Sequence, residues 1–176
     1  MVRSTTCAMS SSPAGRCEGG LTDDYLEPAG VFERAFVNRS REAPAVFRHE
    51  GKYFIITSGC TGWDPNAAEY AVAMSIMGPW KVMGNPCRGP LAGRTFNAQS
   101  SFVLPVAGKP GAFIFMADRW NRDDLGDSRY VWLPMRVGGR RCRLSGRKGG
   151  NCPRWAGFKI GRVNVVAILE QCVAKL

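Results

Sequence analysis

Histidine and closely spaced cysteine pairs are scarce in this sequence of 176 residues, which limits the metal sites it can form. There is one histidine, His49, and none of the seven cysteines falls in a Cys-x-x-Cys pair. A structural zinc site takes four Cys or His ligands at short spacings, so we expect no metal site. Two interpretations of the cysteines stay open: one disulfide between Cys60 and Cys87, or unpaired thiols that act as small apolar side chains.

Long apolar runs are also absent. The first sixteen residues contain no apolar core of about 7 to 15 residues, so no secretion signal is visible. Near the other end, the apolar stretch 163–169 is interrupted by Asn164 and is far shorter than the roughly 20 residues that span a bilayer. The sequence therefore predicts no membrane span.

Helical periodicity is missing as well, and 21 glycines and 11 prolines divide the chain into short segments. Runs rich in β-branched and aromatic residues lie between the turns, which is typical of strands. The sequence predicts a hairpin around Gly51 with two further strands, followed by a second set of three. The predicted strands cover residues 43–49, 53–57, 70–75, 80–83, 100–104, 112–117 and 130–135.

Four short antiparallel strands make one blade of a β-propeller, and this pattern occurs about twice. We therefore predict an all-β fold, a partial propeller of about two blades, over residues 21–137. Residues 1–20 are rich in Ser, Thr, Gly and Ala without periodicity, which predicts a disordered leader. Beyond residue 137 the composition turns to Gly and Arg, which predicts an irregular basic tail over 138–176 with one short helix at 163–175.

Positive charge is concentrated in that tail. The net charge is +10, and ten of the 24 Lys and Arg residues lie in 136–176, where Glu170 is the one acidic residue. The body is nearly neutral, as suits a domain that binds uncharged sugars. Nucleic-acid binding through the basic tail is a further hypothesis, because such segments bind phosphate backbones non-specifically. The tail has few aromatic side chains to stack on bases, and we expect no nucleic-acid partner.

Three short segments carry side chains suited to carbohydrate chemistry. Arg41-Glu42-Ala43-Pro44 directly precedes the first strand of the hairpin, where a propeller exposes side chains at the end of its central channel. Taken alone, this tetrapeptide is equally typical of a solvated charged pair. Residues 57–63 (TSGCTGW) follow the second strand, and residues 95–101 (TFNAQSS) open the second set. Both place hydroxyl, amide or aromatic groups at strand ends.

Sugar binding needs this mixture of side chains. An aromatic ring stacks on the apolar face of a pyranose, while amides and hydroxyls bond its oxygens. Trp63 and Trp120 are the candidates for stacking, whereas we expect Trp80 and Trp132 in the core.

A much longer likeness supports a carbohydrate function. The run REAPAVFRHEGKYFIITSGCTGWDPNAAEYAVAMSIMGPW, followed by TFNAQSSFVLPVAGKPGAFIFMADRWNRDDLGDSRYVWLP, resembles the C-terminal half of glycoside hydrolase family 43. The likeness is to the branch that contains the exo-β-1,3-galactanases, also called galactan 1,3-β-galactosidases. It covers residues 21–134.

The resemblance implies a five-bladed propeller that hydrolyses O-glycosyl bonds with inversion, using an acid and a base on opposite sides of the scissile bond. Glu42, in REAP, matches the family's general acid. Gln99, in FNAQS, matches a glutamine that stands where a base-like residue is expected. An amide is a poor base, so we assign Gln99 to positioning water or substrate. The resemblance also implies a galactan-like polysaccharide substrate.

The matched segments suggest five residues that bind the substrate: Arg41, Thr61, Trp63, Asn97 and Trp120. No cofactor is expected, and the calcium ion found in some relatives is not indicated by this sequence. The resemblance implies secretion, for which the N-terminus shows no signal. Blades and acidic residues that the family carries before the matched region have no counterpart here. We therefore expect a truncated, impaired and aggregation-prone hydrolase, with a non-catalytic carbohydrate-binding remnant as the alternative.

Overall fold

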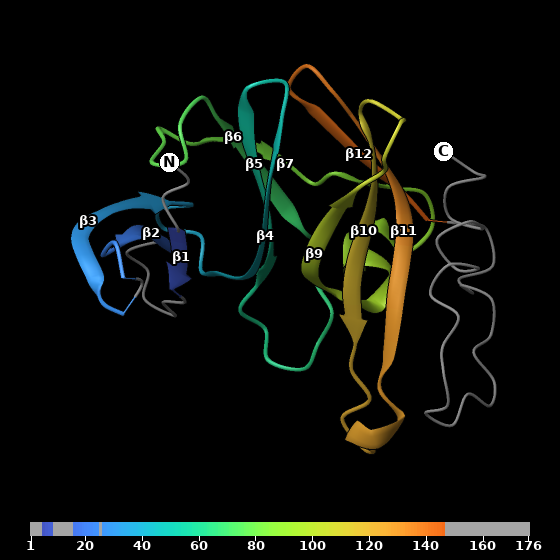
Figure 1. Cartoon of the computed structure of the whole chain (residues 1–176). Helices are drawn as coiled ribbons and strands as arrows, with labels where there is room; N and C mark the ends of the chain where they lie inside the picture. Colours follow the sequence, from blue (N-terminus) through green and yellow to red (C-terminus); the bar gives the residue numbers. More distant parts are fainter. Residues whose placement is uncertain (1–4, 9–15, 25, 147–176) are drawn as a thin grey trace.

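The structure, a computed structural model, describes residues 5–8, 16–24 and 26–146. Its regular structure is almost entirely β-strand, arranged as three sheets (Figure 1). The all-β fold predicted from the sequence is confirmed. The seven predicted strands are all present, with ends shifted by a few residues.

The middle sheet is an antiparallel meander in the order β4-β5-β6-β7. It begins with the predicted hairpin, in which the turn residues Glu50 and Gly51 both have positive φ, 48° and 72°. Two such residues make the tight turn whose twist matches that of the strands it joins. The strands are β4 (Arg41–His49), β5 (Lys52–Gly59), β6 (Glu69–Ala73) and β7 (Lys81–Gly84).

The C-terminal sheet has the order β8-β12-β11-β10-β9. Strands β9 to β12 pair antiparallel in chain order, and the short β8 joins β12 in parallel. The strands are β8 (Cys87–Arg88), β9 (Gln99–Pro105), β10 (Ala112–Arg119), β11 (Arg129–Gly138) and β12 (Arg141–Ser145). Two short 3-10 segments, Ala92–Asn97 and Leu125–Asp127, lie in its connections.

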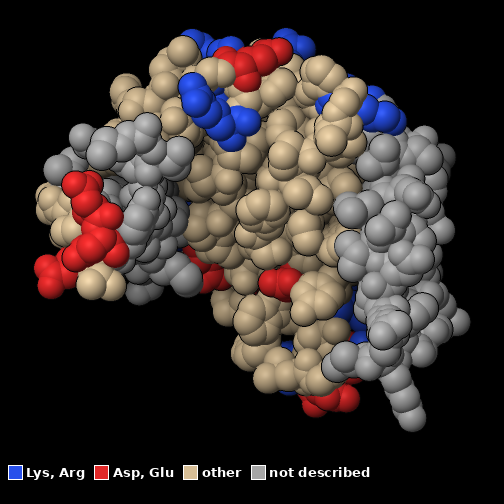
Figure 2. All heavy atoms as spheres, viewed as in Figure 1, with Lys and Arg blue, Asp and Glu red and all other residues tan. Residues whose placement is uncertain are grey.

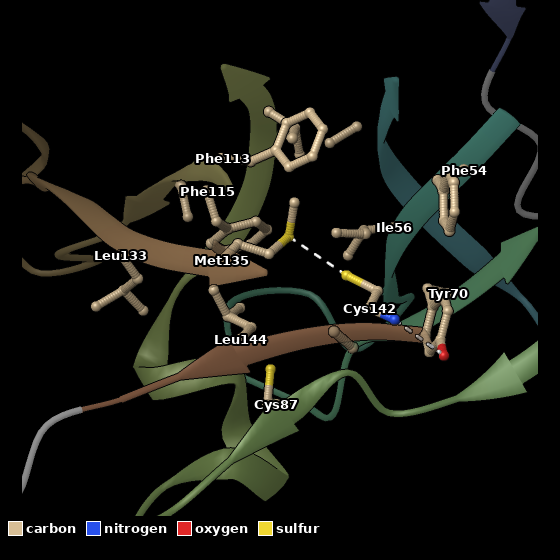
Figure 3. Packing of buried hydrophobic residues seen from close by; sticks show 14 of the residues in the cluster. Phe54, Ile56, Tyr70, Cys87, Phe113, Phe115, Leu133, Met135, Cys142 and Leu144 are labelled. Atoms are coloured by element: carbon tan, nitrogen blue, oxygen red, sulfur yellow. Dashed lines mark hydrogen bonds between the residues drawn. The ribbon is translucent and has the colours of Figure 1, made fainter. Parts of the chain in front are cut away.

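One apolar core fills the space between these two sheets (Figure 3). The ring of Phe47 stacks on that of Phe54 at 5.0 Å and lies 5.1 Å from that of Phe113, so it joins β4 and β5 to β10. Phe115 and Met135 add fully buried side chains from β10 and β11. Because both sheets bury their apolar faces in this single core, they form one packed unit.

The other face of the middle sheet carries a smaller apolar cluster. Ala35 and Phe36, at the end of β3, pack against Ile55 of β5 and are buried with it. Trp80 packs against this cluster, as expected for a core tryptophan. Trp132 differs from expectation, because it is half-buried and lies outside both clusters.

The N-terminal sheet has the order β1-β2-β3, with β1 (Thr5–Ala8), β2 (Arg16–Leu21) and β3 (Pro28–Ala35). The expected disordered leader over residues 1–20 therefore contains two strands. Backbone pairing with β3 accounts for them, since ladder hydrogen bonds need no apolar pattern in the sequence. The rest of the leader lies outside the described residues.

The predicted boundary at residue 137 is wrong, because β12 belongs to the C-terminal sheet. Cys142 and Leu144 point into the core, with exposed fractions of 4% and 0%, while the arginines beside them face outward. Just beyond β12, a Cβ on Gly146 would overlap the ring of Phe96, so the backbone packs directly on that ring. Residues 147–176, including the predicted helix at 163–175, lie outside the described residues.

The buried cysteines act as small apolar side chains. Burial raises the pKa of the Cys87 thiol and that of the Cys142 thiol to about 12, so both are protonated at neutral pH. Cys142 Sγ lies 3.3 Å from Met135 Sδ (Figure 3). Since Cys87 is a free thiol, the disulfide interpretation with Cys60 is wrong.

Basic side chains gather at one end of the described body, with an acidic group among them (Figure 2). Figure 2 shows Lys and Arg gathered at the end of the sheets where Figure 1 places the β4–β5 and β11–β12 turns. Exposed Arg48 and Arg140 lie at these turns. Much of the remaining face in this view is uncharged. No helix in the described part of the chain is long and apolar enough to cross a membrane.

Replacing Leu144 with Ala tests whether β12 is part of the core. The substitution should lower the free energy of unfolding by about 2–5 kcal/mol, because it leaves a cavity where a fully buried side chain stood. Arg143→Ala, on the exposed face of the same strand, is the control and should change it by less than about 0.5 kcal/mol. Urea unfolding of the full chain measures both. Equal, small effects would contradict the placement of β12.

Candidate active site

Two β-bulges position the predicted acid and its neighbour. In β4 the register shifts just after Glu42, where Ala43 takes a left-handed conformation with φ of 48°. In β9 a second shift falls at Ser101, two residues after Gln99. A bulge bends the strand and changes the direction of nearby side chains, and bulges are frequent beside active sites. Glu42 and Gln99 each lie at the start of a strand, just before such a bend.

These bends bring the two predicted catalytic residues together. Gln99 Nε2 donates a hydrogen bond to Glu42 Oε1 at 2.7 Å, although the residues are 57 positions apart. Beside it, Ser100 Oγ donates to the carbonyl oxygen of Ala43 at 2.6 Å. The two bonds join β4 to β9 at consecutive residues and hold the bulge in place.

A cleft of about 370 Å³, counting the space open to solvent, lies next to this pair. Gln99 lines it, as does Ser58, the residue opposite Glu42 in the β4–β5 register. Asp118, opposite Gln99 in the β9–β10 register, lines it as well. Four polar residues on β5, β4, β9 and β10 therefore form a row at one end of the two sheets.

The two candidate stacking tryptophans meet at the cleft, and both line it. The ring centroids of Trp63 and Trp120 are 4.8 Å apart with planes at 77°, an edge-to-face pair. Their exposed fractions are 47% and 52%, which is high for side chains of this size. An exposed aromatic pair beside polar groups suits the apolar face of a sugar ring, which supports the predicted role.

Asn97 reaches the cleft through a strained backbone segment. Thr95, Phe96 and Asn97 have φ of 46°, 58° and 58°, a left-handed run without glycine. Such residues cost about 1–3 kcal/mol each and persist only where contacts hold them. The Arg119 guanidinium supplies contacts, donating to the carbonyl oxygens of Phe96 at 2.7 Å and Asn97 at 3.3 Å. The buried Asn97 Oδ1 has no hydrogen-bond partner among the described residues.

Thr95 ties the same segment to the loop after β5. Its hydroxyl accepts a hydrogen bond from the Ala68 amide at 2.7 Å and donates to the Asn66 carbonyl at 2.7 Å. Asn66 in turn accepts from the Gly59 amide at 2.7 Å and donates to the Gly59 carbonyl at 2.9 Å. The loop that carries Trp63 is thus bonded to the segment that carries Asn97.

Two predicted substrate-binding residues have other roles in the structure. Arg41 is 9% exposed, and its guanidinium bonds the hydroxyl and carbonyl of Thr57 and the carbonyl of Ala67. Burial lowers the pKa of Arg41, and nearby Glu69 opposes that shift. The Thr61 hydroxyl bonds Asp64 and Asn66 within its own loop and does not line the cleft. Both residues stabilise the site from outside it.

Seven residues that line the cleft were not predicted from the sequence: Ser58, Gly62, Asp64, Pro65, Asn66, Ala98 and Asp118. Ser58 and Asn66 lie in or next to the TSGCTGW segment, so that segment pointed to the right place. Asp118 has no motif around it, and only the pairing of β9 with β10 places it beside Gln99. Burial raises the pKa of the Asp118 carboxyl above its usual value. Within the described ranges, no group of three or more His, Cys, Asp or Glu could hold a metal ion.

Solved structures similar to this chain share one family. A family 43 β-1,3-galactosidase matches 82% of this chain and 31% of its own, at 34% identity and a TM-score of 0.77. A second one, with galactodeoxynojirimycin, matches 84% of this chain and 46% of its own, at 41% identity and a TM-score of 0.72. The exo-β-1,3-galactanase of Phanerochaete chrysosporium with β-1,3-galactotriose matches 80% and 31%, at 27% identity and a TM-score of 0.70.

The resemblance to glycoside hydrolase family 43 is confirmed. The described strands are consistent with part of a family 43 β-propeller, and the number of blades stays a prediction. The chain spans about a third to just under half of the length of these family 43 structures. No family model and no curated protein matches the sequence.

Replacing Thr95 with Val tests the bond that joins the two halves of the cleft. Valine keeps the shape but leaves the Ala68 amide and the Asn66 carbonyl unpaired, which should cost about 1–3 kcal/mol of unfolding free energy. Thr95→Ser keeps the hydroxyl and should retain most of that stability. Thermal and urea unfolding distinguish the two. No loss in Thr95→Val, or a larger loss in Thr95→Ser than in Thr95→Val, would mean that the methyl group matters more than the hydrogen bonds here.

Proposed function

We propose that this chain is a family 43 glycoside hydrolase of the β-1,3-galactan type, with Glu42 as the general acid. The hydrogen bond between Gln99 and Glu42 beside a polar cleft with two tryptophans carries this proposal. The similarity to β-1,3-galactosidases at 34% and 41% identity supports the choice of reaction and linkage.

In the proposed reaction, Glu42 gives a proton to the glycosidic oxygen as the bond to the leaving sugar breaks. The Gln99 amide donates to one oxygen of the Glu42 carboxyl, so the other oxygen can hold the proton. Inversion also requires a base about 6.5–9.5 Å away that activates water. Gln99 cannot take that proton, because an amide is a poor base. We assign it to orienting Glu42 and the water or sugar hydroxyl next to it.

We assign no residue of the described part of the chain to the role of base. For that reason we expect the chain on its own to hydrolyse galactan slowly, in line with the impaired activity expected from the sequence. The substrate proposed is a β-1,3-linked galactan chain, since the Phanerochaete enzyme was solved with β-1,3-galactotriose.

Binding without cleavage is the second candidate function. It is supported by the exposed pair of Trp63 and Trp120 in the polar cleft, which suits a sugar without any proton transfer. Removal of the Glu42 carboxyl distinguishes the two candidates, because hydrolysis needs that group and binding alone does not.

Glu42→Gln separates hydrolysis from binding. It should reduce release of galactose from β-1,3-galactan by about 10²- to 10⁴-fold, the contribution of a positioned general acid. Galactan affinity should change little, because the amide keeps the size of the side chain. Glu50→Gln, at the exposed β4–β5 turn, is the control and should match the unsubstituted chain. Binding with no hydrolysis in any variant would favour the second candidate.

Trp120→Ala tests the stacking surface common to both candidates. Loss of the ring should weaken galactan binding by about 2- to 10-fold, as expected for one aromatic contact. Phe32→Ala is the control, because Phe32 is an aromatic side chain with 61% exposure on β3 that does not line the cleft. Affinity electrophoresis in galactan gels compares the variants. Equal mobility shifts would contradict a role for Trp120 in binding.

A further inference from the structure

Asp118 is a cleft residue to which the proposed reaction assigns no task. It is the second-last residue of β10 and lies opposite Gln99 in the β9–β10 register. Residues opposite each other on antiparallel strands have Cβ atoms about 4.5–5.5 Å apart, so Asp118 stands one strand beyond the Glu42–Gln99 pair. Two residues later, Trp120 lines the same cleft.

The Asp118 carboxylate has neither a hydrogen bond nor an ion pair within the part of the chain that the structure describes. Several other acidic residues there are bonded: Glu69 accepts from Arg39, Asp127 from Arg129, and Asp124 from the Gly126 amide. Asp118 is half-buried, and burial raises the pKa of its carboxyl. Since a desolvated carboxylate without donors disfavours the folded state, this position suits a ligand that brings donors.

The surroundings of Asp118 indicate the chemistry of that ligand. A cation held by carboxylates needs several oxygen ligands, and no group of three such residues exists in the described ranges. The neighbouring groups are the Gln99 amide and the rings of Trp120 and Trp63, which suit an uncharged ligand with an apolar face. An ionised carboxylate accepts hydrogen bonds through both oxygens, which fits two neighbouring hydroxyl groups.

Resting on the function proposed above, we propose that Asp118 binds two adjacent hydroxyl groups of the galactose unit that stacks on Trp120. The residue is a determinant of substrate affinity and orientation. Glu42 transfers the proton, Gln99 orients Glu42, and Asp118 fixes the ring from the next strand.

Titration calorimetry of the full chain with β-1,3-galactotriose tests the assignment. Asp118→Ala should weaken binding by about 10- to 100-fold, as expected for hydrogen bonds to a charged group. Asp118→Asn keeps one acceptor oxygen, so its affinity for galactotriose should lie between that of Asp118→Ala and that of the unsubstituted chain. Asp123→Asn, in the exposed loop after β10, is the matched control and should bind within 2-fold of the unsubstituted chain.

Two further readouts distinguish a ligand contact from a structural role. The melting temperature of Asp118→Asn at neutral pH should equal or exceed that of the unsubstituted chain, since the substitution removes a charge that burial disfavours. Hydrolysis by Asp118→Ala should show the KM for galactan raised by about 10- to 100-fold and kcat lowered by a smaller factor, because the lost hydrogen bonds hold the substrate and take no part in the proton transfer.

The outcomes separate this inference from the proposed function. If Asp118→Ala binds galactotriose as tightly as the unsubstituted chain while Glu42→Gln still abolishes hydrolysis, the inference is wrong and the proposed function stands. Lost hydrolysis at saturation with unchanged affinity also overturns it, and assigns Asp118 to the bond-breaking step. If the unsubstituted chain neither binds nor cleaves, both are overturned.

Discussion

Strands β4 and β9 belong to different sheets, yet they lie side by side over a shared apolar core. At one end of β4 the ring of Phe47 stacks on Phe54 and packs at a tilt against Phe113, which joins the two sheets. At the other end, Glu42 meets Gln99. A hydrogen bond of 2.7 Å between residues so distant in sequence depends on that packing, so the candidate acid is positioned by the core as much as by its own strand.

Three irregular backbone segments lie around the cleft. They are the bulges in β4 and β9 and the left-handed run from Thr95 to Asn97. Specific hydrogen bonds hold these segments. The Ser100 hydroxyl donates to the Ala43 carbonyl at the β4 bulge. In the left-handed run, the Thr95 hydroxyl accepts from the Ala68 amide, and Arg119 donates to the Phe96 carbonyl. Strained backbone of this kind is frequent at functional sites, where it orients side chains toward a ligand at a cost in local stability.

Runs rich in β-branched and aromatic residues, separated by turn residues, predicted seven strands well, because such side chains favour strands. The same reasoning missed β12. Three of its five residues have charged or hydroxyl side chains, and only the structure shows that Leu144 is buried. The family resemblance named Glu42 and Gln99 but placed Gln99 at the base position across the scissile bond, so their direct hydrogen bond was not predicted. The sequence does not reveal that the Arg41 guanidinium bonds backbone carbonyls, and its predicted contact with the substrate stays a prediction. The place of Asp118 in the cleft follows from the β9–β10 register alone, which the sequence does not show.

A crystal structure of the Glu42→Gln chain with β-1,3-galactotriose is the most direct test of the central claim, that the cleft beside Glu42 and Gln99 holds the scissile bond. The account predicts a galactose ring against Trp63 and Trp120, with the glycosidic oxygen within about 3 Å of the side chain at position 42. A trisaccharide bound elsewhere, or one whose glycosidic oxygens all lie beyond hydrogen-bond reach of that side chain, would contradict it.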